Sequence, residues 1–570
     1  MAMFDTAHNR LSYSELLKPD VGYHLEFAVG LTYSLDLEAL LGVPVSLGLL
    51  DEMDSDMMKS PFYLLEAIRK CSDQIAIFCN AGSISLPTKI QSVYSLLESS
   101  VFEVKLPNRQ NFHPKVWMIK YANKNGDTYI KLLVLSRNLT FDTSIDLCVA
   151  LRGEISNANN EQNQPLVDLL KFVMPHADRS KRKLIESLAE DLLKVSSFEI
   201  THPFESVSFL PIGISGYGKA QTELFNPKND LFVVSPFLSD DVIKEISGGC
   251  DRKVLVTRKH SITPAVMESF DSVYVTKDLL VSNEFGVKQD IHAKLYFTKT
   301  SNGNYLYMGS ANASHNAFNN NVEFLVKFKY KINCMGFKTF VKEFIPEDNC
   351  PYERIEILPE AIPVDESDKL VSEAIKEAIY AIKLAAISQN GDAFNVTITS
   401  KDLNTKEQIK IAPLHRQDLF VPLANEIKFS TMLLKELSEF YVLSVREKKV
   451  VIKVKSKGIP EDRDDAIYKS IIDSKAKFLS YISFILSDDY SMSAFEAYDA
   501  SRLVGKNRNT NSNQDVSTAV YEKMLKLIHE APERFNEVAD LIKRLDPEVI
   551  GPEFMEIYRE FEKAVRRIRR

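Results

Sequence analysis

Two stretches of the chain carry the same order of chemically active residues, and this repeat constrains the fold more than any other feature. FHPKVWMIKY leads to LSRNLT and then SIDLCVAL, and IHAKLYFTK leads to GSANAS and then NVEFLVKF. Each copy has His-x-Lys, then Ser-x-Asn, then an acid in an apolar run. The candidate catalytic residues are His113, Lys115, Asn138, His292, Lys294 and Asn312, and the candidate supporting residues are Ser136, Asp146, Ser310 and Glu323.

The apolar pattern around both copies predicts an α/β fold. Short runs such as QIAIFCN, VWMIKY, KVLVTRK and YLYMGS are typical of buried strands, and 61–71 has helical spacing. EFAVGLTYSLDLEAL (26–40) and LFVVSPFLSDDVI (231–243) share one layout, an apolar strand, a small-residue turn and an acidic helix start. We therefore expect an internal repeat with a period of about 200 residues.

Changes of pattern along the 570 residues divide the chain into four predicted domains. An amphipathic helix over 365–388 is expected, followed by strand-like alternations to about residue 456 and by helical patterns thereafter. The predicted domains are a first lobe (1–190), a second lobe (191–360), a helix plus β-rich module (361–457) and a helical C-terminal region (458–570).

Charge and cysteine usage limit the classes of protein. There are 70 basic and 78 acidic residues, which excludes a uniformly basic surface but permits a local basic groove. The six cysteines form no CxxC pair, so we expect neither a disulfide framework nor a zinc site. This cysteine usage fits a protein of a reducing compartment. We find no signal-peptide pattern and no uncharged apolar run of roughly 18 residues, so we expect a soluble, cytoplasmic protein.

The duplicated residues suit the chemistry of a phosphate ester. On a strand, residues i and i+2 point to one face, so each His-x-Lys would direct both side chains into a common site. Two lysines and two asparagines would hold the phosphate, and no metal or other cofactor is required. One imidazole could attack phosphorus to form a phosphohistidine while the other protonates the leaving oxygen. Asp146 and Glu323 are the candidates for fixing the imidazole tautomers.

The two copies, HPK…LSRNLT…IDL and HAK…GSANAS…NVEF, resemble the duplicated motif of the phospholipase D superfamily over about residues 20–345. The first copy lacks the usual Gly, and Lys120 and Lys299 stand where the lipases of the family have Asp. In this respect the chain is similar to tyrosyl-DNA phosphodiesterases and to metal-independent nucleases.

The resemblance implies a pseudo-twofold pair of α-β-α lobes with His113 as nucleophile and His292 as general acid. It further implies a nucleic-acid substrate, with DNA favoured over RNA. A role in bacterial anti-phage defence beside a helicase or ATPase partner also follows from the resemblance.

Two other functions stay open, a phospholipid hydrolase or transferase and a non-catalytic nucleic-acid-binding subunit. Arg137 and Arg258 are further candidates for phosphate contacts, and His315, which follows GSANAS, is a candidate for lining the site. Trp117 is expected in the core, and the basic run 179–183 is expected on a solvated helix face.

Overall fold

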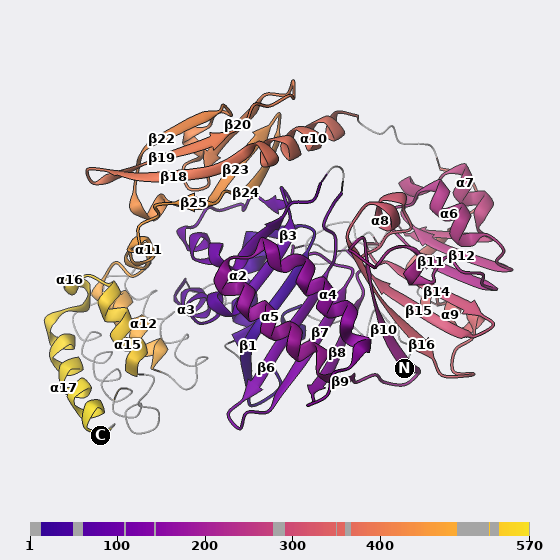
Figure 1. The fold of residues 1–570 in the computed structure, drawn as a ribbon, viewed down its shortest axis with the longest axis horizontal. Helices are drawn as coiled ribbons and strands as arrows, with labels where there is room; N and C mark the ends of the chain where they lie inside the picture. The colour runs from indigo at the N-terminus through magenta and orange to yellow at the C-terminus, as the bar shows by residue number, and fades with distance from the viewer. Residues whose placement is uncertain are drawn as a thin grey trace.

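The fold consists of two lobes, a β-rich module above the first lobe and a group of C-terminal helices (Figure 1). In this computed structural model the described residues are 13–48, 61–107, 110–141, 144–277, 291–348, 350–359, 366–486, 524 and 535–568.

The first lobe is a seven-stranded sheet in the order β5-β3-β1-β6-β7-β8-β9. Strand β1 is parallel to β3 and antiparallel to β6. Alternate residues of β1 enter two different cores: Phe27 and Val29 pack with helices α4 and α5, and Ala28 packs with α2 and α3. The bounds are β1 Tyr23–Thr32, β3 Ile75–Asn80, β5 Val101–Val104, β6 Val116–Asn123, β7 Thr128–Leu135, β8 Cys148–Ile155, β9 Val195–Phe198, α1 Tyr13–Leu17, α2 Leu37–Gly48, α3 Pro61–Cys71, α4 Gln164–Val173 and α5 Arg179–Leu193.

The second lobe repeats this plan in an eight-stranded sheet, β10-β16-β15-β14-β11-β12-β13-β17. Its run β12-β11-β14-β15-β16 matches β3-β1-β6-β7-β8 in order, and β11 is likewise parallel to one neighbour and antiparallel to the other. Helix α9 covers one face, in a core shared with the first lobe, and α6 to α8 cover the other. The predicted α/β fold class with two related α-β-α lobes is confirmed. The bounds are β10 Phe204–Ile212, β11 Asp230–Val234, β12 Arg252–Thr257, β13 Ser272–Thr276, β14 Leu295–Thr300, β15 Gly303–Gly309, β16 Glu323–Tyr330, β17 Tyr352–Ile355, α6 Asp240–Ser247, α7 Pro264–Ser269, α8 His315–Asn319 and α9 Phe337–Phe344.

The β-rich module contains a four-stranded sheet, β22-β19-β18-β25, and shares a six-stranded sheet, β2-β4-β24-β23-β20-β21, with the first lobe. Strands β2 (Leu35–Asp36) and β4 (Ile84–Ser85) belong to the first lobe in sequence, so hydrogen-bonded strands connect the two parts. The other bounds are α10 Glu366–Ala381, β18 Ile382–Asn390, β19 Ala393–Ser400, β20 Ile409–Pro413, β21 Val421–Pro422, β22 Glu426–Met432, β23 Phe440–Val445, β24 Lys448–Lys453 and β25 Ser456–Lys457.

The expectation of one helix over 365–388 is wrong in its second part. Helix α10 ends at Ala381, and Ile382 begins strand β18. The apolar spacing continues past this point, but the backbone of β18 pairs with β19 and β25 instead. Tertiary pairing therefore ends a helix that the local pattern would have extended.

The C-terminal helices pack around a core of their own that includes Phe478 and Phe554. They join the rest of the molecule where Arg463 of α11 pairs with buried Glu98 of the first lobe at 2.6 Å, and Ser438 of the β-rich module donates a hydrogen bond to the same carboxylate. Part of the predicted helical region 458–570 lies outside the described residues. Among the helices that the structure describes, none is long and apolar enough to cross a bilayer. The bounds are α11 Arg463–Ile471, α12 Lys475–Ile485, α15 Phe535–Arg544, α16 Pro547–Ile550 and α17 Pro552–Ile568.

Candidate active site

Each His-x-Lys segment lies in the extended residues directly before a central strand, rather than on the strand itself. Residues 113–115 precede β6 and residues 292–294 precede β14. The backbone here crosses to the other lobe: the His113 N–H donates to the Val322 carbonyl at 2.8 Å, and the His292 N–H donates to the Ile145 carbonyl at 3.0 Å. Those two acceptors directly precede Glu323 and Asp146, so each histidine is placed beside the acid of the opposite copy.

The side chains pair across the lobes in the same way. Nδ1 of His113 lies 2.8 Å from Oε2 of Glu323, and Nδ1 of His292 lies 3.2 Å from Oδ1 of Asp146. The serine of each copy orients the acid of its own copy, because Ser136 donates to Asp146 at 2.6 Å and Ser310 donates to Glu323 at 2.5 Å. Each acid is thus held by one lobe and turned toward the histidine of the other.

These carboxylates assign the imidazole tautomers. A carboxylate accepts hydrogen bonds, so the proton of each neutral imidazole is assigned to Nδ1, and Nε2 carries the lone pair. Glu323 also accepts from Ser310 and from the side-chain amide of Asn321 at 3.2 Å, as expected for an ionised acceptor. Both histidines therefore present an unprotonated Nε2.

The lysines lie beneath the histidines. Nζ of Lys115 is 3.2 Å from Nε2 of His113, and both lysines donate to the carbonyl of the histidine two residues earlier. Lys115 and Lys294 are 1% and 0% exposed, whereas the side chains of His113 and His292 keep 14% and 15%. Solvent reaches the imidazoles while the two positive charges are held in the interior.

Burial and mutual charge shift the pKa values of all these groups. Burial lowers the pKa of His113 to about 4, against the opposing effect of Glu323. Burial also lowers the pKa of His292, and lowers the pKa of Lys115 to about 8. The pKa of Lys294 falls well below its usual value because of burial and of Lys115. Both imidazoles are consequently neutral at pH 7, and the two buried ammonium groups repel each other.

The pKa of Asp146 is shifted in the opposite direction. Burial raises it, but hydrogen bonds from His292 and from the Ser136 hydroxyl, together with the charge of Lys294, bring it below its usual value. The pKa of Asp146 thus depends on groups from both copies, which indicates one shared site.

Three buried acceptors at the site have no hydrogen-bond partner among the described residues. They are Oδ1 of Asn138, Oδ1 of Asn312 and Oδ2 of Asp146. Buried polar atoms in folded proteins are almost always paired, so unpaired atoms at equivalent positions in the two copies point to a ligand. Either amide can turn its NH₂ group toward an anion.

Backbone geometry explains why only the second copy has the Gly before its serine. Gly309 has φ +150°, and a Cβ at this position would lie 2.2 Å from the Phe324 carbonyl oxygen. Leu135 occupies the equivalent place in the first copy and is part of β7. Leu135 is not among the residues with positive φ, so the first copy does not require Gly at this place.

Sequence reasoning missed two residues of the site. The Tyr33 ring packs against the His113 ring with centroids 4.8 Å apart. Asn321 connects Glu323 to Asn111 of the first lobe, because it donates to Glu323 and accepts from the Asn111 backbone N–H at 3.3 Å. Tyr33 lies in the small-residue turn of the repeated layout, which was the available signal.

The other candidates have different environments. His315 is exposed and pairs with Asp241 at 2.6 Å, and Trp117 is in the core as expected. Arg258 donates to the Ile291 carbonyl, directly before His292, so it borders the site. Arg137 donates to the carbonyl of Thr140. Within the described ranges, no three His, Cys, Asp or Glu side chains are grouped so that they could hold a metal ion.

No family model and no curated protein matches this sequence. Among solved structures, the chain is similar to a mutant of yeast tyrosyl-DNA phosphodiesterase, with 12% identity, a TM-score of 0.37 and coverage of 58% of this chain and 87% of that one. It is also similar to the polyphosphate kinase of Porphyromonas gingivalis, with 12% identity, a TM-score of 0.33 and coverage of 58% and 44%. A further match is Nuc of Salmonella typhimurium, with 16% identity, a TM-score of 0.17 and coverage of 22% and 83%. Nuc is described as a phospholipase D family member, the family that the duplicated motif resembles.

Proposed function

We propose that the chain is a metal-independent phosphodiesterase of the phospholipase D type, with its active site at the junction of the two lobes. The observation that carries this proposal is that each histidine pairs with the acid of the opposite lobe, which we call the exchange of acids. His113 pairs with Glu323, and His292 pairs with Asp146. Two oriented imidazoles above two buried lysines form an arrangement that suits a phosphodiester and its pentacoordinate transition state.

The lysines and asparagines are the phosphate-binding groups in this proposal. Burial lowers the pKa values of Lys115 and Lys294 even though the carboxylates of Asp146 and Glu323 act in the opposite direction. A phosphodiester anion would supply the compensating charge, and the amides of Asn138 and Asn312 would donate to its non-bridging oxygens. The lysines take the role that a metal ion has in other phosphodiesterases.

The proposed reaction has two steps. Nε2 of His113 attacks phosphorus and forms a P–N bond, while the bond to the leaving oxygen breaks and His292 gives that oxygen a proton. His292 then removes a proton from water, which attacks phosphorus and releases His113. The pKa of about 4 keeps His113 unprotonated, as a nucleophile requires. His292 takes up its proton when the substrate anion binds and raises its pKa.

We propose nucleic acid as the substrate, with DNA favoured over RNA. The support is the form of the motif, in which Lys120 and Lys299 replace the Asp of the lipase pattern. We extend the proposal to a cytoplasmic protein of bacterial anti-phage defence with a helicase or ATPase partner. This extension has its support in the resemblance of the motif.

The decisive experiment is cleavage in the presence of excess EDTA. We expect the full chain to cleave DNA in chelator, and His113→Ala and His292→Ala to abolish cleavage. His315→Ala is the matched control, because this exposed histidine pairs with Asp241 outside the site. Reactions denatured at alkaline pH, where the P–N bond survives, should contain a His113 peptide that is joined through phosphorus to one part of the cleaved DNA, as detected by mass spectrometry.

Three results would contradict the proposal. Strict dependence on Mg²⁺ would exclude the metal-independent mechanism. Cleavage of phospholipid vesicles in preference to DNA or RNA would assign the lipid alternative. DNA binding that needs Lys115 and Lys294, with no cleavage of any substrate, would assign a binding subunit.

A further inference from the structure

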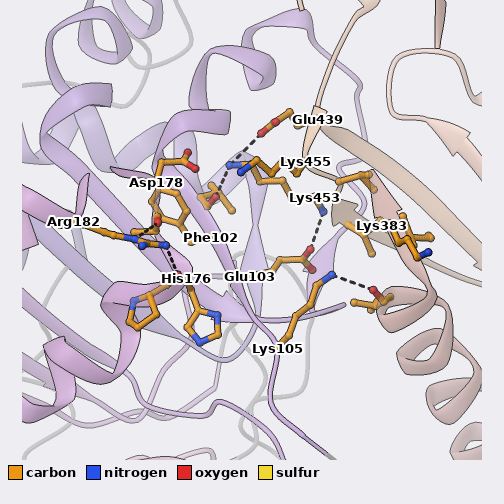
Figure 2. Close-up of a pocket in the computed structure, with 17 residues that line it drawn as sticks. Phe102, Glu103, Lys105, His176, Asp178, Arg182, Lys383, Glu439, Lys453 and Lys455 are labelled. Carbon is orange, nitrogen blue, oxygen red and sulfur yellow. Dashed lines mark hydrogen bonds and ion pairs between the residues drawn. The ribbon is translucent and has the colours of Figure 1, made fainter. Parts of the chain in front are cut away.

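A second site is suggested by a cavity of about 320 Å³ between the first lobe and the β-rich module (Figure 2). None of the candidate catalytic residues lines it. The first lobe contributes β5, the residue Lys105 after it and the start of α5, and the module contributes the start of β18 and the end of β24. The cavity is therefore formed only when the two parts are docked.

The cavity has more positive than negative side chains. Figure 2 shows cations on both sides, with Arg182 on the first lobe and Lys383 on the module. The charged lining residues are Lys105, Arg182, Lys383, Lys453 and Lys455, against Glu103, Asp178 and Glu439.

Two of the three carboxylates are already engaged. Glu103 accepts the backbone N–H of Gly82 at 2.8 Å and that of Lys453 at 2.9 Å. Glu439 accepts the backbone N–H of Ser456 at 2.9 Å and pairs with the Lys453 ammonium at 3.3 Å. These contacts occupy the oxygens of both carboxylates, and the lining as a whole has five cationic against three acidic side chains.

The remaining cations are available. Lys383 and Lys455 are exposed, and the described residues provide no hydrogen bond or ion pair to either ammonium group. Arg182 is held by the carbonyls of Pro175 and Ala177 at 2.7 and 2.8 Å, which bond Nη2 and Nε and leave Nη1 for a ligand. Three cations with free donors against one free carboxylate favour an anion.

Apart from His176, the rest of the lining is apolar. Phe102, Ile379, Ile382, Ile452 and Val454 contribute to it. An apolar wall beside a cationic rim suits a ligand with a flat base and a phosphate group. The volume is at the lower end of the range of about 300–1,000 Å³ for small-molecule sites, which favours a mononucleotide over an oligonucleotide.

We propose that this cavity binds a nucleoside mono- or diphosphate, which fastens the β-rich module to the first lobe. The base would lie on the isoleucine wall, and the phosphates would bind Arg182, Lys383 and Lys455. The module already contacts this part of the lobe through α10, because Lys105 donates to the carbonyl of Ile379 at 3.0 Å.

The segment that the ligand would fasten leads directly to His113. Tyr380 of α10 donates to the Leu106 carbonyl, and the Lys376 ammonium donates to the Asn111 side chain at 2.9 Å. Asn111 is two residues before His113 in the chain. A bound nucleotide would thus act on the connection between the module and the candidate active site.

Calorimetric titration of the full chain tests the proposal without any measurement of cleavage. We expect ADP to bind at least tenfold more tightly than pyrophosphate, because pyrophosphate has similar charge but nothing for the apolar wall. The double variant Lys383→Ala/Lys455→Ala should weaken ADP binding at least tenfold. The matched control Lys410→Ala/Lys435→Ala removes exposed lysines of the same module outside the cavity and should leave the affinity unchanged.

Hydrogen exchange gives an independent readout. ADP should slow amide exchange in 101–106 and 379–384 and leave α6 unchanged. Absence of ADP binding at millimolar concentration, equal binding of pyrophosphate, or an unchanged affinity in the double variant would overturn the proposal. Displacement of ADP by a short single-stranded oligonucleotide at micromolar concentration would assign the cavity to a longer nucleic acid and would overturn it too.

Discussion

At the scale of single residues, the carboxylates decide what each histidine can do. Glu323→Gln keeps the size of the side chain and removes the charge that holds His113 in its tautomer. We expect turnover of DNA to fall by about 10²- to 10⁴-fold, the usual contribution of an oriented general acid–base group. A fall of less than tenfold in steady-state kinetics, with folding verified by circular dichroism, would contradict this role.

Asp146→Asn should affect a different step. Asp146 orients His292, which is the proposed general acid. A substrate with an activated leaving group does not need a general acid to protonate the leaving oxygen. We expect this variant to lose turnover of DNA but to keep most of the initial burst of p-nitrophenol from bis(p-nitrophenyl) phosphate, which reports the first step alone, whereas Glu323→Gln loses both. The opposite pattern would exchange the roles of the two histidines.

The lowered pKa of His113 also links stability to pH. The ordinary pKa of the imidazole is 6.5 and its pKa in the folded chain is about 4. Between pH 6.5 and pH 4, the unfolded chain therefore binds a proton at His113 that the folded chain does not bind. Stability from this group is fully present above pH 6.5 and is lost as the pH falls through about 4, by up to about 3 kcal/mol. We expect His113→Asn to reduce the shift of the thermal unfolding midpoint between pH 7 and pH 4.5, and His315→Asn to leave it as in the wild type. Equal shifts in all three proteins would contradict the buried, neutral state of His113.

Much of the candidate site could be predicted from sequence, but not its connectivity. The duplicated motif predicts which residues come together, and the cross-lobe contacts of His113 and His292 show that its two copies meet. The exchange of acids could not be predicted, because it depends on two backbone crossings, from Phe112 to Val322 and from Ile145 to Ile291. A single sequence contains no signal for such contacts, and the catalytic roles stay predictions.

At the scale of secondary-structure elements, short apolar runs predicted the central strands of both lobes. The pattern failed where Ile382 continues the apolar spacing of α10 and yet begins β18. Helical and strand patterns are hard to distinguish in a short apolar run, and pairing with β19 decides between them.

The strand β15 ends at a position that tolerates no side chain. Gly309→Ala would place Cβ 2.2 Å from the Phe324 carbonyl at φ +150°, and the backbone that carries Ser310 would have to move. We expect a loss of more than about 2 kcal/mol in the free energy of unfolding and loss of cleavage. Gly126→Ala is the control. Gly126 also has a positive φ, +88°, but a Cβ added there would have no atom within 4 Å, so this variant reports backbone strain without a steric clash. Similar unfolding midpoints for the two variants would contradict the steric explanation.

At the scale of the whole molecule, Glu98 and Arg463 join three parts of the chain. Burial raises the pKa of Glu98, and the charge of Arg463 partly offsets this effect. Arg463→Met would leave a buried carboxylate without its partner, and we expect a cost of about 3–5 kcal/mol. Glu98→Gln/Arg463→Met should recover most of the urea unfolding midpoint. A double variant as unstable as the single one would show that packing, rather than the ion pair, makes this junction.

The exchange of acids between the lobes has a consequence for the timing of protein synthesis. A ribosome delivers residue 113 long before residue 323, so the first histidine emerges without the carboxylate that orients it. Nascent chains and early termination products would lack the carboxylate that orients His113. Only a polypeptide translated past both copies would carry the complete set of paired histidines and acids.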